Sequence, residues 1–172
     1  KKNLDLKHKI TIDIFSDTIC PWCYIGKRKL QFAIDCFPYC KFNITWRPYR
    51  LNPDMPFEGM DRQEYLKQKF GGLKEASKIY SIIYETGKNI GIFFQFDKIK
   101  RTPDSFTSHK LLALGHKKGK QNQIIETLFY SYFIEGKDIG QIKELMAIAK
   151  HNKIDEQVTK SYLTSNQDKT GL

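Results

Sequence analysis

Hydrophobic and polar residues alternate twice near the start of the chain, and a helical spacing separates the two stretches. Isoleucines at 10, 12 and 14 alternate with more polar neighbours, which predicts a strand over residues 10–15. Apolar residues three and four apart then predict a helix over 24–36, which Pro38 ends. A second alternation predicts a strand over 42–47. The first fifty residues therefore form a predicted β–α–β unit with parallel strands.

The rest of the chain is predicted to be almost entirely helical. A loop over 52–59 leads into a short helix over 61–70, which Gly71 and Gly72 end. Further apolar stripes predict helices over 73–90, from Pro103 onward, around 124–133, around 142–149 and over 155–163. The chain is therefore an α/β protein in which only two strands are convincing. A two-stranded sheet is marginal alone, so we expect helices or further strands to cover it.

The composition is that of a globular protein with a basic surface. Of the 172 residues, 40% are hydrophobic and 13% aromatic, which suits one domain or one domain with an insertion. No run approaches the roughly 18 apolar residues of a membrane helix, so we expect no membrane partner. The net charge of +10 comes from scattered lysines rather than one basic stripe. This favours a solvated surface over a nucleic-acid site, and we expect no nucleic-acid partner.

The strongest chemical signal is Cys20-Pro21-Trp22-Cys23, which lies where the first strand gives way to the helix. Unpaired N–H groups and the helix dipole favour a thiolate at that helix N-terminus. We therefore predict that Cys20 attacks as the nucleophile and that Cys23, one turn further in, is the resolving thiol. Pro21 and Trp22 are candidate substrate-binding residues, since tryptophan offers an apolar surface to a peptide. Neither brings a positive charge near sulfur, so we expect a less oxidising pair than one with an intervening histidine.

Two other interpretations compete for these cysteines: a zinc site completed by Cys36 and Cys40, and a passive buried pair. A helix between Cys20 and Cys36 would separate them by more than about 20 Å, because each residue rises about 1.5 Å. Zinc and the predicted helix therefore exclude each other, and we expect neither a metal nor an organic cofactor. Haem attachment would need histidine where residue 24 is Tyr24. Cys36 and Cys40 are interpreted as small hydrophobes packed under the βαβ unit, with a regulatory disulfide as the alternative.

Two further residues are candidates near the dithiol. Asp17, three residues before Cys20, could relay protons to the buried thiol or cap the local turn. His109 could face the dithiol groove and bind substrate, or lie on a helix surface or at the edge of the core. His8, His116 and His151 lie in charged or helix-end segments and carry less weight.

Four segments together resemble one family. Residues 16–26, SDTICPWCYIG, followed by a basic helix, resemble the DsbA-like thioredoxin-fold proteins of the FrnE type. RPYRLNP at 47–53, TPDS and SHKL within 102–111, and YFIEGKDI at 132–139 are similar to later parts of its pattern, in the same order. The resemblance implies a thioredoxin-like fold with an inserted all-α domain, and dithiol–disulfide exchange on protein thiols. The expected parts are the βαβ unit at 1–53, the helical insertion at 54–165 and a tail at 166–172.

One part of the family pattern has no counterpart in these residues. The family carries, after its helical region, a Gly-Val-Pro-like segment whose cis proline lies against the CxxC, then a strand hairpin and a final helix. Here no proline follows Pro103. We therefore expect the C-terminal part of the sheet to be missing and exchange activity to be weakened. Free strand edges would then favour a homodimer.

Three functions fit these observations. The first is a thiol–disulfide oxidoreductase or isomerase that acts on protein or peptide thiols, with glutathione as a further thiol partner. The second is a redox-inactive, chaperone-like module that binds peptides through Trp22 and the helical region. The third is a glutathione-using transferase or isomerase similar to the kappa class, against which the second cysteine, Cys23, argues.

The expected compartment is the cytoplasm. Four cysteines are too few for a disulfide-stapled secreted scaffold, and residues 1–9 lack the apolar segment of a signal peptide. The first residue is not Met, so an upstream organellar or secretory targeting segment is the alternative.

Overall fold

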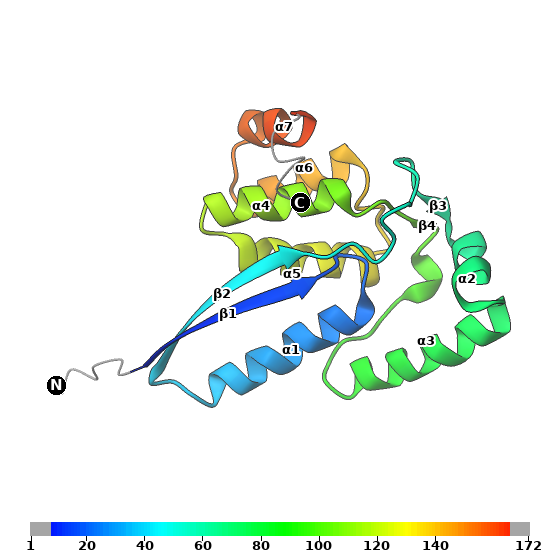
Figure 1. Ribbon diagram of the computed structural model, residues 1–172, viewed down its shortest axis with the longest axis horizontal. Helices are drawn as coiled ribbons and strands as arrows, with labels where there is room; N and C mark the ends of the chain where they lie inside the picture. Colours follow the sequence, from blue (N-terminus) through cyan, green and yellow to red (C-terminus); the bar gives the residue numbers. More distant parts are fainter. Residues whose placement is uncertain (1–7, 166–172) are drawn as a thin grey trace.

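A two-stranded parallel ribbon lies between helices in the computed structural model, which describes residues 8–165 (Figure 1). The first seven residues and the predicted tail at 166–172 lie outside the described residues. Strand β1 (His8–Ser16) and strand β2 (Cys40–Pro48) are joined by helix α1 (Pro21–Asp35). Because Ser16 pairs with Pro48, the carboxyl ends of both strands meet near the start of α1. The α/β class and the predicted βαβ unit are confirmed.

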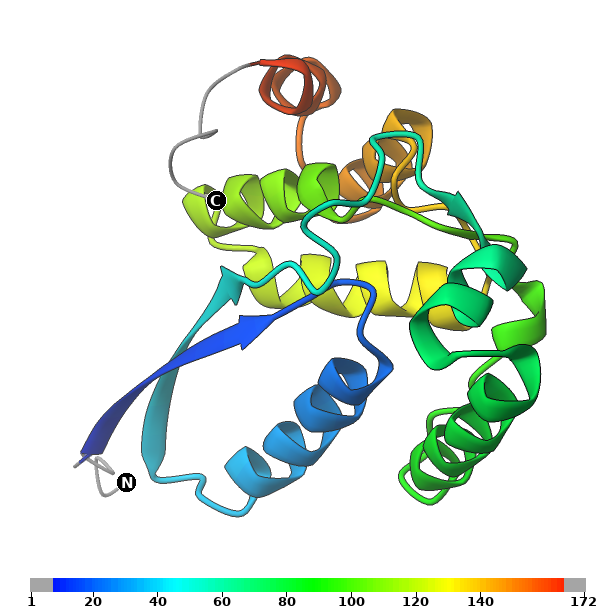
Figure 2. The ribbon, with the colours of Figure 1, turned by 45° about the vertical axis from the view of Figure 1, so that its right-hand side comes forward.

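Helices make up most of the remaining described chain. In order they are α2 (Arg62–Phe70), α3 (Leu73–Lys88), α4 (Phe106–Lys117), α5 (Gln121–Phe133), α6 (Ile142–His151) and α7 (Glu156–Thr164), with a 3-10 turn at Phe96–Lys98. Helix α1 lies on one side of the ribbon, and α4 and α5 lie on the other (Figures 1 and 2). None of the helices within 8–165 is long and apolar enough to cross a bilayer.

Helix α5 connects the ribbon to the core. Leu128 and Phe129 of α5 are fully buried, and the Tyr24 ring of α1 stacks on Phe129 at a centroid distance of 5.0 Å. At strand β2, the Gln121 side chain accepts the Trp46 N–H at 2.8 Å and donates to the Trp46 carbonyl at 3.0 Å. Helix α5 thus contacts both β2 and the first turn of α1, which contains Cys23.

The predicted helix start at Pro103 is wrong, because α4 begins at Phe106. The preceding residues form strand β4 (Arg101–Thr102), which pairs with strand β3 (Met60–Asp61) in a short antiparallel ladder. Asp104 then accepts the Phe106 N–H at 3.2 Å and forms an ion pair with Arg50. Tertiary contacts therefore keep this segment extended past the proline, and the region after residue 53 contains strands as well as helices.

Candidate redox site

The two cysteines of the motif lie at the start of α1. Cys20 is the N-cap residue, Pro21 occupies the first helical position, and the Cys20 carbonyl accepts the N–H of Cys23 at 3.1 Å. All four cysteines of the chain are free. Cys36 lies at the opposite end of α1, so the helix that excludes a four-cysteine zinc site is present. Among the described residues, no group of three or more His, Cys, Asp or Glu side chains is placed to hold a metal ion.

The Cys20 and Cys23 side chains form a hydrogen bond with each other. The hydrogen bond from Cys20 lowers the pKa of Cys23 to about 6; burial opposes this shift, and Ser16 and the Asp17 N–H add to it. The same contact and burial raise the pKa of Cys20, although the N–H groups of Cys23 and Trp22 favour its thiolate. The two thiols therefore titrate as one unit, and the attacking role of Cys20 stays a prediction. The pair as a unit loses its first proton more readily than an ordinary thiol does.

The neighbours of the dithiol differ between its two sides. Cys23 packs against the hydrophobic core and lines an apolar cavity of about 210 Å³. Pro21 is buried, whereas the Trp22 side chain is 47% exposed. An apolar surface therefore lies in solvent beside the first cysteine. The substrate-binding roles of Pro21 and Trp22 stay predictions.

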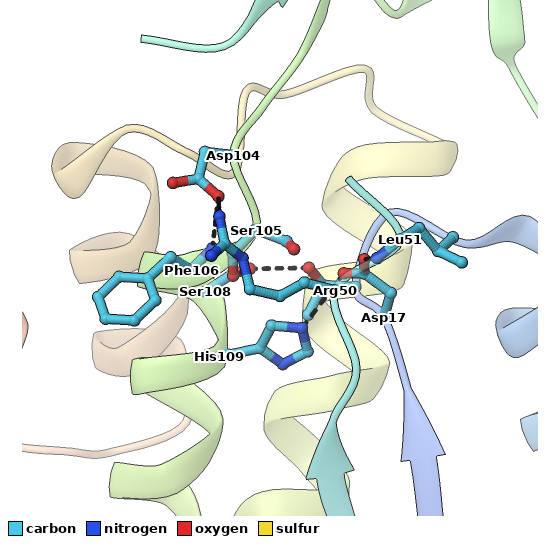
Figure 3. Close-up of polar contacts among 9 residues, drawn as sticks. Asp17, Arg50, Leu51, Asp104, Ser105, Phe106, Ser108 and His109 are labelled. Atoms are coloured by element: carbon cyan, nitrogen blue, oxygen red, sulfur yellow. Dashed lines mark hydrogen bonds and ion pairs between the residues drawn. The ribbon is translucent and has the colours of Figure 1, made fainter. Parts of the chain in front are cut away.

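A buried polar corner supports the turn before Cys20 (Figure 3). Asp17 is 1% exposed, and one of its carboxylate oxygens lies 3.2 Å from Nε2 of His109, which is 2% exposed. Its other oxygen accepts the Leu51 N–H at 2.7 Å. Burial alone would raise the pKa of Asp17, but the hydrogen bond and charge of His109, with the Leu51 N–H, hold it below its usual value. His109 therefore lies at the edge of the core, one of the two positions expected for it, and its substrate-binding role stays a prediction.

The first turn of α4 makes further contacts with this turn and with the end of β2. The Thr18 and Ser108 hydroxyls are 2.7 Å apart, and Ser108 also donates to the Ser105 carbonyl. Arg50 forms its ion pair with Asp104 at 2.5 Å, and its guanidinium lies 5.7 Å from the Phe106 ring centroid (Figure 3). These partners were not predicted from the sequence, although Arg50 and Ser108 stand in the RPYR and SHKL segments that carry the resemblance.

Cys36 and Cys40 lie away from this corner. Cys36 is exposed at the C-cap of α1, where its thiol donates to the Phe32 carbonyl at 3.3 Å. Cys40 is half-buried at the start of β2. The prediction that both pack under the βαβ unit is therefore wrong for Cys36, because α1 leaves its last turn in solvent.

Comparisons with known proteins agree with this architecture. A family model described as the DSBA-like thioredoxin domain matches residues 11–172. The uncharacterized protein YwbO of Bacillus subtilis is 23% identical over 157 residues, which are 90% of this chain and 72% of that protein. A probable DsbA oxidoreductase from Streptomyces coelicolor superposes with a TM-score of 0.81 at 20% identity, over 91% of this chain and 68% of the other.

A second solved structure has the same fold. It is the cytosolic disulfide reductase DsbM from Pseudomonas aeruginosa with GSH, with a TM-score of 0.57 and 14% identity over 89% of this chain and 70% of that one. At these identities the likeness shows a shared fold. The family model does not distinguish subtypes, so the FrnE type stays a prediction.

Proposed function

This chain belongs to the DSBA-like thioredoxin family, and we propose that it is a thiol–disulfide oxidoreductase that works through Cys20 and Cys23. One observation carries the proposal: two free thiols lie at the start of α1, Cys20 as its N-cap residue and Cys23 in its first turn. The hydrogen bond between them lowers the pKa of Cys23 to about 6. Such a pair is largely ionised at neutral pH, and the thiolate is the form that attacks a disulfide.

The proposed reaction uses the two sulfurs in turn. Transfer of the hydrogen-bonded proton from Cys20 to Cys23 leaves a Cys20 thiolate, which the N–H groups of Trp22 and Cys23 stabilise. This thiolate attacks one sulfur of a substrate disulfide, so that the substrate S–S bond breaks, a mixed disulfide forms and one substrate thiolate leaves. Cys23 then attacks the Cys20 sulfur and releases the second substrate thiol. The substrate gains two electrons and two protons, and the enzyme is left with a Cys20–Cys23 disulfide.

Exposed apolar side chains near the dithiol support a polypeptide substrate. Trp22 is exposed between the cysteines, and Tyr49 and Leu51 are exposed at the end of β2. The N–H groups of Tyr49 and Leu51 bind Ser16 and Asp17, so both residues adjoin the turn before Cys20. The same apolar surface favours a second candidate function, a chaperone-like module that binds unfolded chains without redox chemistry.

A small thiol is the proposed reductant of the Cys20–Cys23 disulfide. The disulfide reductase DsbM, which shares this fold, was solved with GSH, and this supports glutathione as the partner. The proposal predicts that reduced glutathione sustains turnover in place of a synthetic dithiol. The cytoplasmic location and the homodimer stay predictions.

Insulin reduction in the presence of dithiothreitol tests the proposed function. We expect Cys20→Ala to reduce insulin at the uncatalysed rate, because the remaining Cys23 has no partner thiol to resolve a mixed disulfide. Cys36→Ala is the matched control, since it removes an exposed cysteine from the other end of the same helix, and it should match the wild type. Wild-type activity in Cys20→Ala would refute the catalytic role. Suppression of protein aggregation by that variant would instead support the chaperone-like function.

A further inference from the structure

We infer that Asp17 and His109 form a buried carboxylate–imidazole pair that controls the protonation of the dithiol. Both are positioning residues, because they are almost fully buried and touch the turn before Cys20 rather than a substrate. The inference rests on the proposed function, since it assigns a regulatory role at the dithiol on which that function depends. It concerns thiol protonation, which is measurable without any exchange activity.

Asp17 is held in a fixed position relative to both cysteines. Its main-chain carbonyl accepts the Cys20 N–H at 3.2 Å, and its own N–H favours the Cys23 thiolate. Its carboxylate is bonded on one side to His109 and on the other to the Leu51 N–H. The carboxylate therefore cannot turn toward solvent, and its negative charge acts directly against a thiolate on Cys23.

His109 connects this corner to a second cavity. Figure 3 shows one ring nitrogen directed at Asp17 and the other directed away from it. The ring lines a cavity of about 200 Å³, together with residues 45–48 of β2, several α4 residues and Gln121. A water molecule occupies about 30 Å³ in the liquid, so this space can hold water that exchanges protons with the imidazole. The cavity gives His109 a route to solvent protons.

The net charge of the Asp17–His109 pair has two values, and they differ in their effect on a thiolate in the dithiol. With His109 protonated, the pair is neutral and does not oppose a thiolate. With His109 neutral, the uncompensated Asp17 carboxylate opposes it. The other charged or titratable groups around the pair are Cys20 and Cys23 from α1, the Arg50–Asp104 ion pair, and Arg47, His116 and Lys117 along the cavity. Arg50 and Asp104 neutralise each other, so His109 is the group that compensates Asp17 directly.

Two substitutions test this inference, because each replaces one partner of the hydrogen bond by a neutral amide and only one of them keeps the negative charge. His109→Gln leaves the Asp17 carboxylate uncompensated, whereas Asp17→Asn removes it. The thiolate of the reduced, full-length protein is titrated by its ultraviolet absorbance, with Cys20→Ala/Cys23→Ala as the blank. We expect the first thiol pKa to be higher in His109→Gln than in Asp17→Asn by about half a unit or more, with the wild type between them or equal to one of them.

A purely structural role for the pair gives a different result. Loosening the turn would move both variants in the same direction and by a similar amount, so coincident or reversed values overturn the inference. His116→Gln and Asp13→Asn are matched controls. The first changes a histidine of the same helix and cavity, and the second a β1 carboxylate that pairs with Arg47 in solvent. Both should titrate like the wild type.

A reciprocal measurement on the intact pair applies if either buried variant fails to fold, as judged by circular dichroism. In the reduced protein, ionisation of the thiols should change the ring resonances of His109 in the wild type and should not do so in Cys20→Ala/Cys23→Ala. Nuclear magnetic resonance of labelled histidine measures both titrations. Identical curves would refute the coupling. A protein that shows the coupling but fails to reduce insulin would refute the proposed function alone.

Discussion

Helix α1 carries a cysteine at each end, and the two ends place sulfur in different surroundings. Cys20 is the half-buried N-cap residue, where the N–H groups of Trp22 and Cys23 favour its thiolate. Cys36 is the exposed C-cap residue, and its thiol donates to the Phe32 carbonyl. Free N–H groups at a helix start attract negative charge, whereas free carbonyls at a helix end accept a proton donor. The helix start and the hydrogen bond to a second thiol therefore separate the dithiol from the surface thiol at the other end of α1.

The two ends of helix α1 also differ in how tightly they are packed. Tyr24, directly after the dithiol, is 2% exposed and contacts both Phe129 and Glu126 of α5. Phe32, two turns later, is 50% exposed. The helix is thus held by its first turns and left in solvent at its last. A reactive group on a helical turn that packing holds in place keeps its geometry better than one on a loop.

Removal of the Tyr24 side chain should have the largest effect. Tyr24→Ala deletes a buried ring and its hydrogen bond to Glu126, so we expect the free energy of unfolding to fall by about 3 kcal/mol or more. Phe32→Ala, a matched aromatic truncation at the solvent end, should change it by less than about 0.5 kcal/mol. Urea unfolding followed by circular dichroism measures both. Similar losses in the two variants would show that α1 is not held mainly at its dithiol end.

Alkylation should show the next largest effect. Cys36 is exposed and Cys20 and Cys23 are half-buried, so accessibility alone would make Cys36 react first. Because the pKa of Cys23 is lowered to about 6, we expect the dithiol peptide to react about tenfold faster than the Cys36 peptide near neutral pH. Iodoacetamide labelling of the reduced protein, read by peptide mass, measures this ratio. Faster labelling of Cys36 would mean that exposure outweighs thiolate character.

Cys23→Ser sharpens the alkylation experiment. It removes the second thiol, which is the hydrogen-bond partner of Cys20. The ratio of labelling of the dithiol peptide to labelling of the Cys36 peptide should therefore fall. An unchanged ratio would mean that the helix start alone, without the second sulfur, activates Cys20.

Long periodic segments made most of the fold predictable from the sequence. The βαβ unit and the later helices follow from alternation and helical spacing, which reflect which side of each element is buried. The β3–β4 ladder could not be found in this way, because strands of two residues have no period. Met60 pairs with Thr102, and neither residue carries a local signal for the other. The helix start at Pro103 failed for the same reason, since that ladder and the Arg50–Asp104 ion pair hold the segment extended.

The candidate site was predictable in its residues but not in their partnerships. Cys20 and Cys23 follow from the motif alone, and Asp17 and His109 were each candidates. Their hydrogen bond joins residues 92 positions apart, so only the packing of α4 against the turn creates it. For His109 both a groove and the edge of the core were open, and the buried face of α4 that carries it agrees with the core edge. The hydrogen bond between the Cys20 and Cys23 thiols depends on the orientation of the two side chains, which sequence spacing does not specify.

The smallest expected effect concerns Glu126, which links α5 to the dithiol end of α1. Its carboxylate lies 2.7 Å from Nζ of Lys27 and 3.4 Å from Arg28, and it accepts the Tyr24 hydroxyl at 3.2 Å. Burial alone would raise the pKa of Glu126, but Lys27 and Arg28 lower it below its usual value. The stabilisation is therefore present above the unfolded-state pKa, near 4.5, and is lost as the pH falls through the lower folded-state value.

Glu126→Gln should reduce the free energy of unfolding by about 0.5–1 kcal/mol at neutral pH, a small loss because the 38% exposed carboxylate is screened by solvent. Asp35→Asn is the control, since Asp35 accepts a hydrogen bond from Gln31 at the solvent end of α1, and it should have almost no effect. Urea unfolding of each variant at several pH values measures the difference. The loss in Glu126→Gln should shrink as the pH falls below about 4.5, because the carboxylate gains its proton first in the unfolded wild type and, at lower pH, in the folded protein. A loss that persists unchanged in acid would assign the contact to side-chain packing and hydrogen bonding rather than to charge.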